Sequence, residues 1–212
     1  QAELSRAVKL AEHMPDVASS PDAWDRDDGL FCCRNGTLDL HTGELRPHRA
    51  EDMITRCSPV PYDKRAQAPN WTRMLERVLP DVDVREFLQR YAGYSMTGST
   101  REQCLVICWG DGLNGKSTII EALRYVMGDY SRNCPTETFL APTGHAAAAT
   151  NDLARLCGVR MVTAVESDGG RQLAEAQVKR LTGGDMITAR LLYKEFFDFV
   201  PKFKLILAVN EK

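Results

Sequence analysis

A glycine-rich run near the middle of the chain has the residue types and spacing of a phosphate-binding loop. Residues 110–117 read Gly-Asp-Gly-Leu-Asn-Gly-Lys-Ser and match the pattern G-x-x-x-x-G-K-[ST]. An apolar run at 104–109 precedes the match and a helical pattern at 116–127 follows it, which is the context that this pattern requires. Backbone N–H groups at such a strand-to-helix turn form a concave binding site for anions. The sequence therefore predicts a nucleotide-binding site at this turn.

The residues of this run have separate predicted roles. Lys116 is expected to reach the β- and γ-phosphates of ATP, Ser117 to ligate magnesium through its hydroxyl, and Thr118 to lie near the α-phosphate. The other candidate nucleotide-binding residues, whose backbone closes around the phosphates, are Gly110, Gly112, Asn114 and Gly115. A glycine-rich turn without a ligand would leave the lysine and the hydroxyl unexplained.

Two further polar residues follow apolar runs that have the pattern of strands. Glu166 comes directly after the run at 160–165, where an acid would hold magnesium or activate the attacking water. Asn210 comes after the run at 203–209, where an amide would orient water or contact the γ-phosphate. Because open α/β sheets place their sites at the carboxyl ends of strands, both join Lys116 as catalytic candidates. The alternatives are a solvated strand end for Glu166 and a simple turn residue for Asn210.

A basic segment with the pattern of a hairpin lies between the two candidates. From residue 179 to 204 the chain has six basic residues against three acidic ones, and 186–199 reads as a hairpin. Such a surface suits contact with a nucleic-acid backbone, and Tyr193 could stack on a base or sugar. A solvated amphipathic hairpin is the alternative interpretation.

The order of the elements around these candidates predicts an α/β fold. After residue 97, apolar strands alternate with helical patterns, as in a mostly parallel sheet. One of these helices is expected at 171–181, before the two glycines at 183–184. Residues 1–96 differ: a helical pattern near the start, short strands with tight turns at 30–45, a proline-rich stretch, and two helices, at about 70–79 and 81–94. Asn70 is expected to cap the first of these two helices, and the second is expected to have an apolar face of Val84, Phe87, Leu88 and Tyr91. We therefore expect a mixed, largely helical N-terminal region at 1–96 and a second region at 97–212.

Composition adds few constraints. The chain of 212 residues is 43% apolar and has a formal net charge of -2, so a contact with nucleic acid would need a local basic surface. Its seven cysteines form no C-x-x-C pair and are expected to be reduced thiols, with Cys104 and Cys108 in the core. No apolar run approaches the roughly 20 residues of a membrane span, so we expect no membrane partner and a cytoplasmic location.

Taken together, the motifs resemble the superfamily 3 helicases of the phage and plasmid primase type, which are related to the poxvirus primase-helicase. The resemblance covers nearly the whole chain. It is carried by the segments NGTLDL (35–40), TGEL (42–45), GYSMTG (93–98), NGKST (114–118), LARL (153–156), VE (165–166), KRLTGGD (179–185), ITAR (187–190), YK (193–194) and AVN (208–210).

The resemblance implies a P-loop, AAA+-like motor that uses ATP and magnesium. It implies a homo-oligomeric ring, usually a hexamer, that moves 3′ to 5′ along single-stranded DNA and works with a replication primase domain in the same chain or a partner. It also gives roles: Lys116, Ser117 and Thr118 form Walker A, Glu166 is Walker B, with magnesium held by Ser117 and Glu166, and Asn210 is sensor 1. The segment 183–194 corresponds to a DNA-binding hairpin, with Tyr193 and Lys194 at its tip and Arg190 beside them. The source would be a phage or plasmid in a bacterial host.

Two features of the sequence depart from the family pattern. Many members have two adjacent acids at Walker B, whereas Ser167 follows Glu166 here and Asp168 comes next, so the division of the acidic roles stays open. The arginine finger of the family lies beyond the sensor asparagine, and the chain ends at Lys212. We therefore expect the 97–212 core to be incomplete at its C-terminal side.

Two other classes of function compete with a helicase motor. A small-molecule kinase would also have a P-loop, but it would need an arginine-rich lid in place of the basic hairpin. A DNA-loading or scaffold module would bind ATP without turnover, and Glu166 and Asn210 argue against it. DNA-stimulated release of phosphate would separate these classes.

Overall fold

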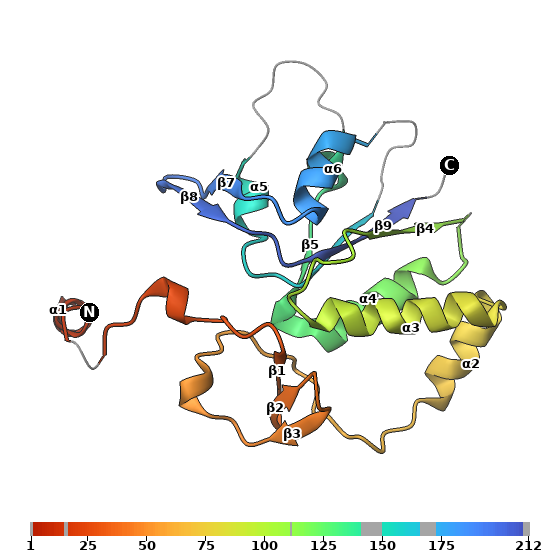
Figure 1. Cartoon of the computed structure of the whole chain (residues 1–212), viewed down its shortest axis with the longest axis horizontal. Coiled ribbons are helices and arrows are strands. Elements are labelled where there is room, and N and C mark those ends of the chain that lie inside the picture. Colours follow the sequence, from red (N-terminus) through yellow and green to blue (C-terminus); the bar gives the residue numbers. More distant parts are fainter. Residues whose placement is uncertain (1, 15–16, 111, 141–149, 166–172, 210–212) are drawn as a thin grey trace.

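The computed structural model describes residues 2–14, 17–110, 112–140, 150–165 and 173–209 (Figure 1). Its helices are α1 (Ala2–Ala11), α2 (Pro69–Val78), α3 (Val82–Met96), α4 (Lys116–Met127), α5 (Thr150–Ala154) and α6 (Glu175–Thr182). Its strands are β1 (Leu30–Cys33), β2 (Gly36–Asp39), β3 (Glu44–Arg46), β4 (Leu105–Trp109), β5 (Ser131–Asn133), β6 (Met161–Val165), β7 (Ile187–Arg190), β8 (Phe196–Phe199) and β9 (Lys204–Val209). The mixed α/β class expected from the sequence is confirmed.

A parallel sheet in the order β4-β9-β6-β5 lies at the centre of the protein (Figure 1). Its register places Trp109 beside Val209, and Val165 beside Ala208. The carboxyl ends of β4, β9 and β6 therefore meet at one edge of the sheet. In open α/β sheets this edge is where functional sites are usually found.

The alternating side chains of β9 explain how this sheet is buried on both faces. Leu205 and Leu207 belong to a hydrophobic cluster with α5, α6 and the β7–β8 hairpin, and Ile206 and Ala208 belong to a second cluster with α3 and α4. All four side chains are at most 4% exposed. Burial of each leucine or isoleucine contributes about 1.5–3 kcal/mol, so β9 is a main source of the stability of the sheet.

The N-terminal strands form a separate antiparallel sheet in the order β1-β2-β3 that packs against the end of α4. The ring of Phe31 stacks on Tyr130, with ring centroids 4.4 Å apart, and both side chains are 1% exposed. The Tyr130 hydroxyl accepts a hydrogen bond from the Cys32 backbone N–H and donates one to the carbonyl of Arg56. In Figure 1, α1 lies apart from the rest of the molecule.

Residues on both sides of position 96 share one hydrophobic cluster. Phe31 and Tyr91 from the N-terminal part pack with Ile120, Tyr130 and Ile206 from the part that follows. The Tyr91 hydroxyl also donates a hydrogen bond of 2.9 Å to the carbonyl of Leu205 on β9. Helix α3 is thus bonded to the parallel sheet as well as packed against it.

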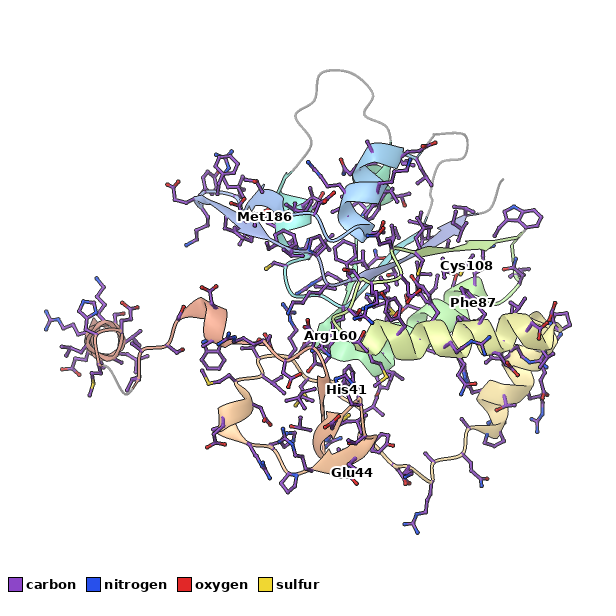
Figure 2. All side chains as sticks on the ribbon, viewed as in Figure 1. His41, Glu44, Phe87, Cys108, Arg160 and Met186 are labelled. Atoms are coloured by element: carbon purple, nitrogen blue, oxygen red, sulfur yellow. The ribbon has the colours of Figure 1, made fainter. Side chains whose placement is uncertain are left out.

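Two buried cations sit where the N-terminal part meets the amino ends of β6 and β9. The guanidinium of Arg160, which is labelled in Figure 2, donates hydrogen bonds to the carbonyls of Leu30, Met96 and Asp27. The ammonium of Lys204 donates to the carbonyls of Thr97, Ser99 and Lys202. Both side chains are at most 4% exposed, and neither has a salt bridge among the described residues. Carbonyl oxygens therefore offset part of the cost of burying these charges.

Several local expectations differ from the structure. Helix α2 begins at Pro69, so Asn70 lies inside the first turn and is not the cap; proline suits that turn because its missing N–H has no helical partner there. On α3, the expected apolar face is only half correct: Leu88 and Tyr91 are buried, whereas Val84 and Phe87 are 43% and 50% exposed. The helix expected from residue 171 begins at Glu175.

Candidate functional site

The glycine loop, residues 110–115, connects β4 to α4; residue 111 lies outside the described residues. Gly110 has φ 149° and Gly115 has φ 85°, values at which a side chain would be strained. Gly115 is the N-cap of α4, so the free N–H groups of the first turn of α4 face the loop. This is the strand–loop–helix arrangement that the sequence predicted, and its partial positive charge suits an anion.

The ammonium of Lys116 lies across the mouth of the glycine loop, where it donates a hydrogen bond to the carbonyl of Gly110. Burial raises the pKa of the Cys108 thiol on β4, and the positive charge of Lys116 opposes that rise. The side chains of Ser117 and Thr118 are exposed on the first turn of α4. The loop thus presents one cation, two hydroxyls and several backbone donors to the same space.

An open pocket of about 540 Å³ lies over this loop, within the size range of small-molecule sites. The glycine loop and α4 form one side of it, with residues 112–118. The other side comes from α2, with Met74, Arg77 and Val78. The pocket therefore joins the part of the chain before residue 96 to the part after it.

The residues of this pocket fit a magnesium nucleotide in part. Lys116, the loop N–H groups and the Ser117 hydroxyl supply the donors and the metal ligand that a polyphosphate needs. The expected acid Glu166, its neighbour Asp168 and the expected sensor Asn210 lie outside the described residues. Their strands do end beside the loop, since Val165 pairs with Ala208, and Val209 pairs with Trp109.

The basic segment forms the expected hairpin. β7 pairs antiparallel with β8, with Arg190 opposite Phe196, and residues 191–195 form the turn. Tyr193 is 95% exposed in this turn and has φ 61°, and the backbone N–H of Lys194 donates to the carbonyl of Leu191. The guanidinium of Arg190 lies 4.6 Å from the ring centroid of Phe196. The structure thus brings Arg190, Tyr193 and Lys194 together at one exposed end of the hairpin.

The hairpin is anchored at its base and lies away from the glycine loop. Ile187, Ala189 and Phe199 are at most 9% exposed in the cluster shared with α5 and α6. The Leu192 N–H donates to the side-chain oxygen of Asn151 at 3.2 Å, which adds a support close to the turn. In Figure 1 the β7–β8 hairpin and the β4–α4 connection lie at opposite sides of the parallel sheet. The candidate residues that the structure describes therefore form two groups, one at the glycine loop and one at the end of the hairpin.

The side chains of α2 in the pocket were missed by sequence reasoning. Met74 and Val78 are four residues apart, which places them on one face of a helix, but an apolar face carries no sign of what it contacts. The glycine loop lies more than 30 residues further along the chain. Only the fold brings the two segments together.

The described residues contain no cluster of three or more His, Cys, Asp or Glu side chains that could hold a metal ion by themselves. All seven cysteines are free. Cys104 and Cys108, expected in the core, are partly buried. No described helix has the length and apolarity to cross a membrane.

Comparisons with known proteins find viral proteins that are named as helicases or primases. Residues 1–80 match a protein family described as "D5 N terminal like". The chain is 30% identical over 203 residues to a protein of Acanthamoeba polyphaga mimivirus named "Putative helicase", covering 92% of this chain and 21% of that protein. It is 22% identical over 210 residues to an African swine fever virus protein named "Putative primase", covering 96% of this chain and 22% of that protein. These matches support a primase-helicase family, and the chain spans about a fifth of the length of these relatives.

Solved structures support the fold. The A form apo structure of the NrS-1 C-terminal region aligns with the whole chain at a TM-score of 0.60 and 11% identity, over 48% of that protein. A second apo structure of the same region, residues 305–718, aligns with 69% of this chain and 34% of its own length at a TM-score of 0.54 and 12% identity. At such identities the likeness concerns the fold alone.

Proposed function

We propose that this chain is part of the ATP-driven motor of a replication primase-helicase, with the glycine loop as its nucleotide site. The observation that carries the proposal is the geometry of the loop: glycines at positive φ, the exposed first turn of α4, and Lys116 held across the loop mouth. The viral relatives named as helicases or primases support the same class of protein. A scaffold without turnover remains the alternative.

The nucleotide roles follow from the positions around the loop. Lys116 would hold the β- and γ-phosphates, Ser117 would ligate magnesium, and the N–H groups of the loop would hold further phosphate oxygens. Bound magnesium would neutralise charge that develops on the phosphates. Glu166 and Asn210 are the proposed partners of this chemistry, because they follow the two strands that end beside the loop.

The exposed end of the β7–β8 hairpin is the proposed contact with single-stranded DNA. Tyr193 offers an exposed ring for stacking, and Lys194 and Arg190 offer positive charges for phosphates. Assembly as a hexameric AAA+-type ring, 3′ to 5′ movement, membership of superfamily 3, a primase domain as partner and a phage or plasmid source in a bacterial cell complete the proposal. They rest on the sequence motifs.

Two lysine variants test the proposal, because each should affect one of the two binding activities and spare the other. Lys116→Ala should abolish the binding of magnesium-ATP, measured by fluorescence titration, and leave the binding of a single-stranded oligonucleotide intact. Lys194→Ala should leave the binding of magnesium-ATP intact and weaken the binding of the oligonucleotide. It should also reduce the salt dependence of DNA binding by a slope of roughly one, because one phosphate contact is lost. Lys64→Ala, an exposed lysine outside both groups, should change neither.

Two outcomes would contradict the proposal, and a third would identify misfolded variants. Unchanged ATP affinity in Lys116→Ala removes the nucleotide site. Unchanged DNA affinity in Lys194→Ala removes the hairpin contact. A loss of both activities in both variants would indicate that the substitutions disturb the fold.

A further inference from the structure

Helix α2 lies beside the glycine loop and lines one side of the pocket. Three of its side chains line this pocket: Met74, Arg77 and Val78. Met74 and Val78 are half-buried and one turn apart, so they form a short apolar stripe, and Arg77 is exposed at its edge. The pocket thus has one polar wall and one wall that is mainly apolar.

The apolar wall is in direct contact with the loop. A Cβ atom built on Gly115 would lie 2.9 Å from Cγ1 of Val78, so the loop glycine leaves no room between them. The end of α2 is fixed in turn by Arg85 of α3, whose guanidinium donates to the carbonyls of Leu79 at 2.6 Å and Pro80 at 2.8 Å. The position of the wall is therefore set by the contact of Val78 with the loop and by the hydrogen bonds from Arg85 of α3.

The two walls suit different parts of one ligand. Backbone N–H groups and Lys116 favour a polyphosphate, and they occupy only the loop side of the pocket. A flat apolar group attached to that polyphosphate would meet the thioether of Met74 and the methyl groups of Val78, since sulfur and aliphatic carbon both make favourable contacts with aromatic rings. A nucleobase is such a group.

We infer that α2 forms the nucleoside wall of this site: Met74 and Val78 contact the base of the bound nucleotide, and Arg77 adds a second cation toward its phosphates. The inference rests on the proposed nucleotide site and deepens it. It gives the part of the chain before residue 96 a direct role in ligand recognition, in addition to its packing on the sheet.

Titration calorimetry with three ligands tests the wall and the site separately. The ligands are ATP, ADP and inorganic tripolyphosphate, each with magnesium. Met74→Ala should weaken the binding of ATP and ADP about tenfold, the usual scale for removing an apolar contact from a pocket. It should leave the affinity for tripolyphosphate unchanged, because tripolyphosphate has no base. Arg77→Ala should weaken the binding of both ATP and tripolyphosphate. Arg73 lies on α2 outside the pocket, so Arg73→Ala is the matched control and should change the affinity for none of the three ligands.

The result for Lys116→Ala distinguishes the failure of the wall from the failure of the site. If Lys116→Ala loses all three ligands while Met74→Ala keeps ATP and ADP within about twofold, the glycine loop binds phosphate and the nucleoside wall is wrong. If Met74→Ala weakens all three ligands equally, α2 supports the loop and does not contact a base, which also overturns the inference. If Lys116→Ala binds both ATP and tripolyphosphate with the affinity of the wild type, the proposed site itself is wrong. Unchanged tripolyphosphate affinity in Arg77→Ala would remove that residue from the wall.

Discussion

Replacing Arg160 with methionine should strongly destabilise the protein without touching either candidate site. Arg160 begins the segment that leads into β6, and its guanidinium joins three chain segments that are far apart in sequence. It donates to the carbonyl of Leu30 at 2.9 Å, to that of Met96 at 2.6 Å and to that of Asp27 at 3.3 Å. Its charged group also lies 4.7 Å from the ring centroid of Tyr130. Methionine keeps much of the aliphatic volume but removes all of these contacts.

The expected loss follows from opposing terms. Three hydrogen bonds to a charged donor at about 1.5–3 kcal/mol each, and a desolvated cation–π contact of about 2 kcal/mol, give a gross stabilisation of roughly 6–11 kcal/mol. Desolvation of the guanidinium opposes this by several kcal/mol, because the side chain is 4% exposed. Removing it also leaves carbonyl oxygens without their donor. We therefore expect Arg160→Met to lower the free energy of unfolding by about 3–5 kcal/mol.

Urea denaturation followed by circular dichroism measures this loss. Arg132→Met is the control, because Arg132 is exposed on the neighbouring strand β5, and it should shift the free energy of unfolding by no more than about 0.5 kcal/mol. A loss below about 1 kcal/mol in Arg160→Met would refute the reasoning, since it would place the net contribution of the buried cation in the range of a surface residue.

Two further predictions concern pH and backbone space. Burial and Arg160 lower the pKa of Lys204 to about 7 from 10.5, so between these values the unfolded chain binds a proton that the folded chain lacks. Burial raises the pKa of Cys32 to about 12 and of Cys33 to about 11. Above pH 9 the folded chain therefore keeps thiol protons that the unfolded chain loses, so stability falls as pH rises. The free energy of unfolding should therefore rise from pH 7 to 9 by up to about 1.4 kcal/mol per unit and then fall, and denaturation of Lys204→Met should show no rise. Gly128→Ala should cost at least about 2 kcal/mol by thermal denaturation, because its Cβ would lie 2.7 Å from the carbonyl of Cys57 at φ 52°; Gly43→Ala, also at positive φ but with open space, should cost about half as much.

Local patterns made the glycine loop predictable from sequence. The spacing from Gly110 to Ser117, between an apolar run and a helical pattern, defines the turn with little help from the rest of the protein. The β7–β8 hairpin was predictable for the same reason, because alternation on both sides of a short turn specifies pairing between neighbours. In both cases, residues close in sequence make the contacts.

Contacts between distant segments could not be predicted in this way. Arg160 and Lys204 are charged residues at the starts of strands, where solvent exposure is the usual outcome, and only the chain that covers them shows why they are buried. Val84 and Phe87 fit the helical period of α3 but lie outside the face that the parallel sheet and α4 cover. The apolar stripe of α2 could not be recognised as one wall of a pocket for the same reason. Helical periodicity shows which residues share a face, but it does not show which segment packs beside that face.

The arrangement of β9 gives the two proposed sites a physical connection. β9 pairs in register with β4, the strand that leads into the glycine loop, and follows the β7–β8 hairpin after only four residues. Those four residues are held at both ends, because Phe199 and Phe203 are buried in the same cluster as Leu205 and Leu207. A displacement of β4 on nucleotide binding would therefore move β9, because five residue pairs join the two strands. The four-residue segment between β8 and β9 would pass that movement to the base of the hairpin. A motor needs such a link, since a nucleotide can move a distant DNA contact only through an element that both sites share.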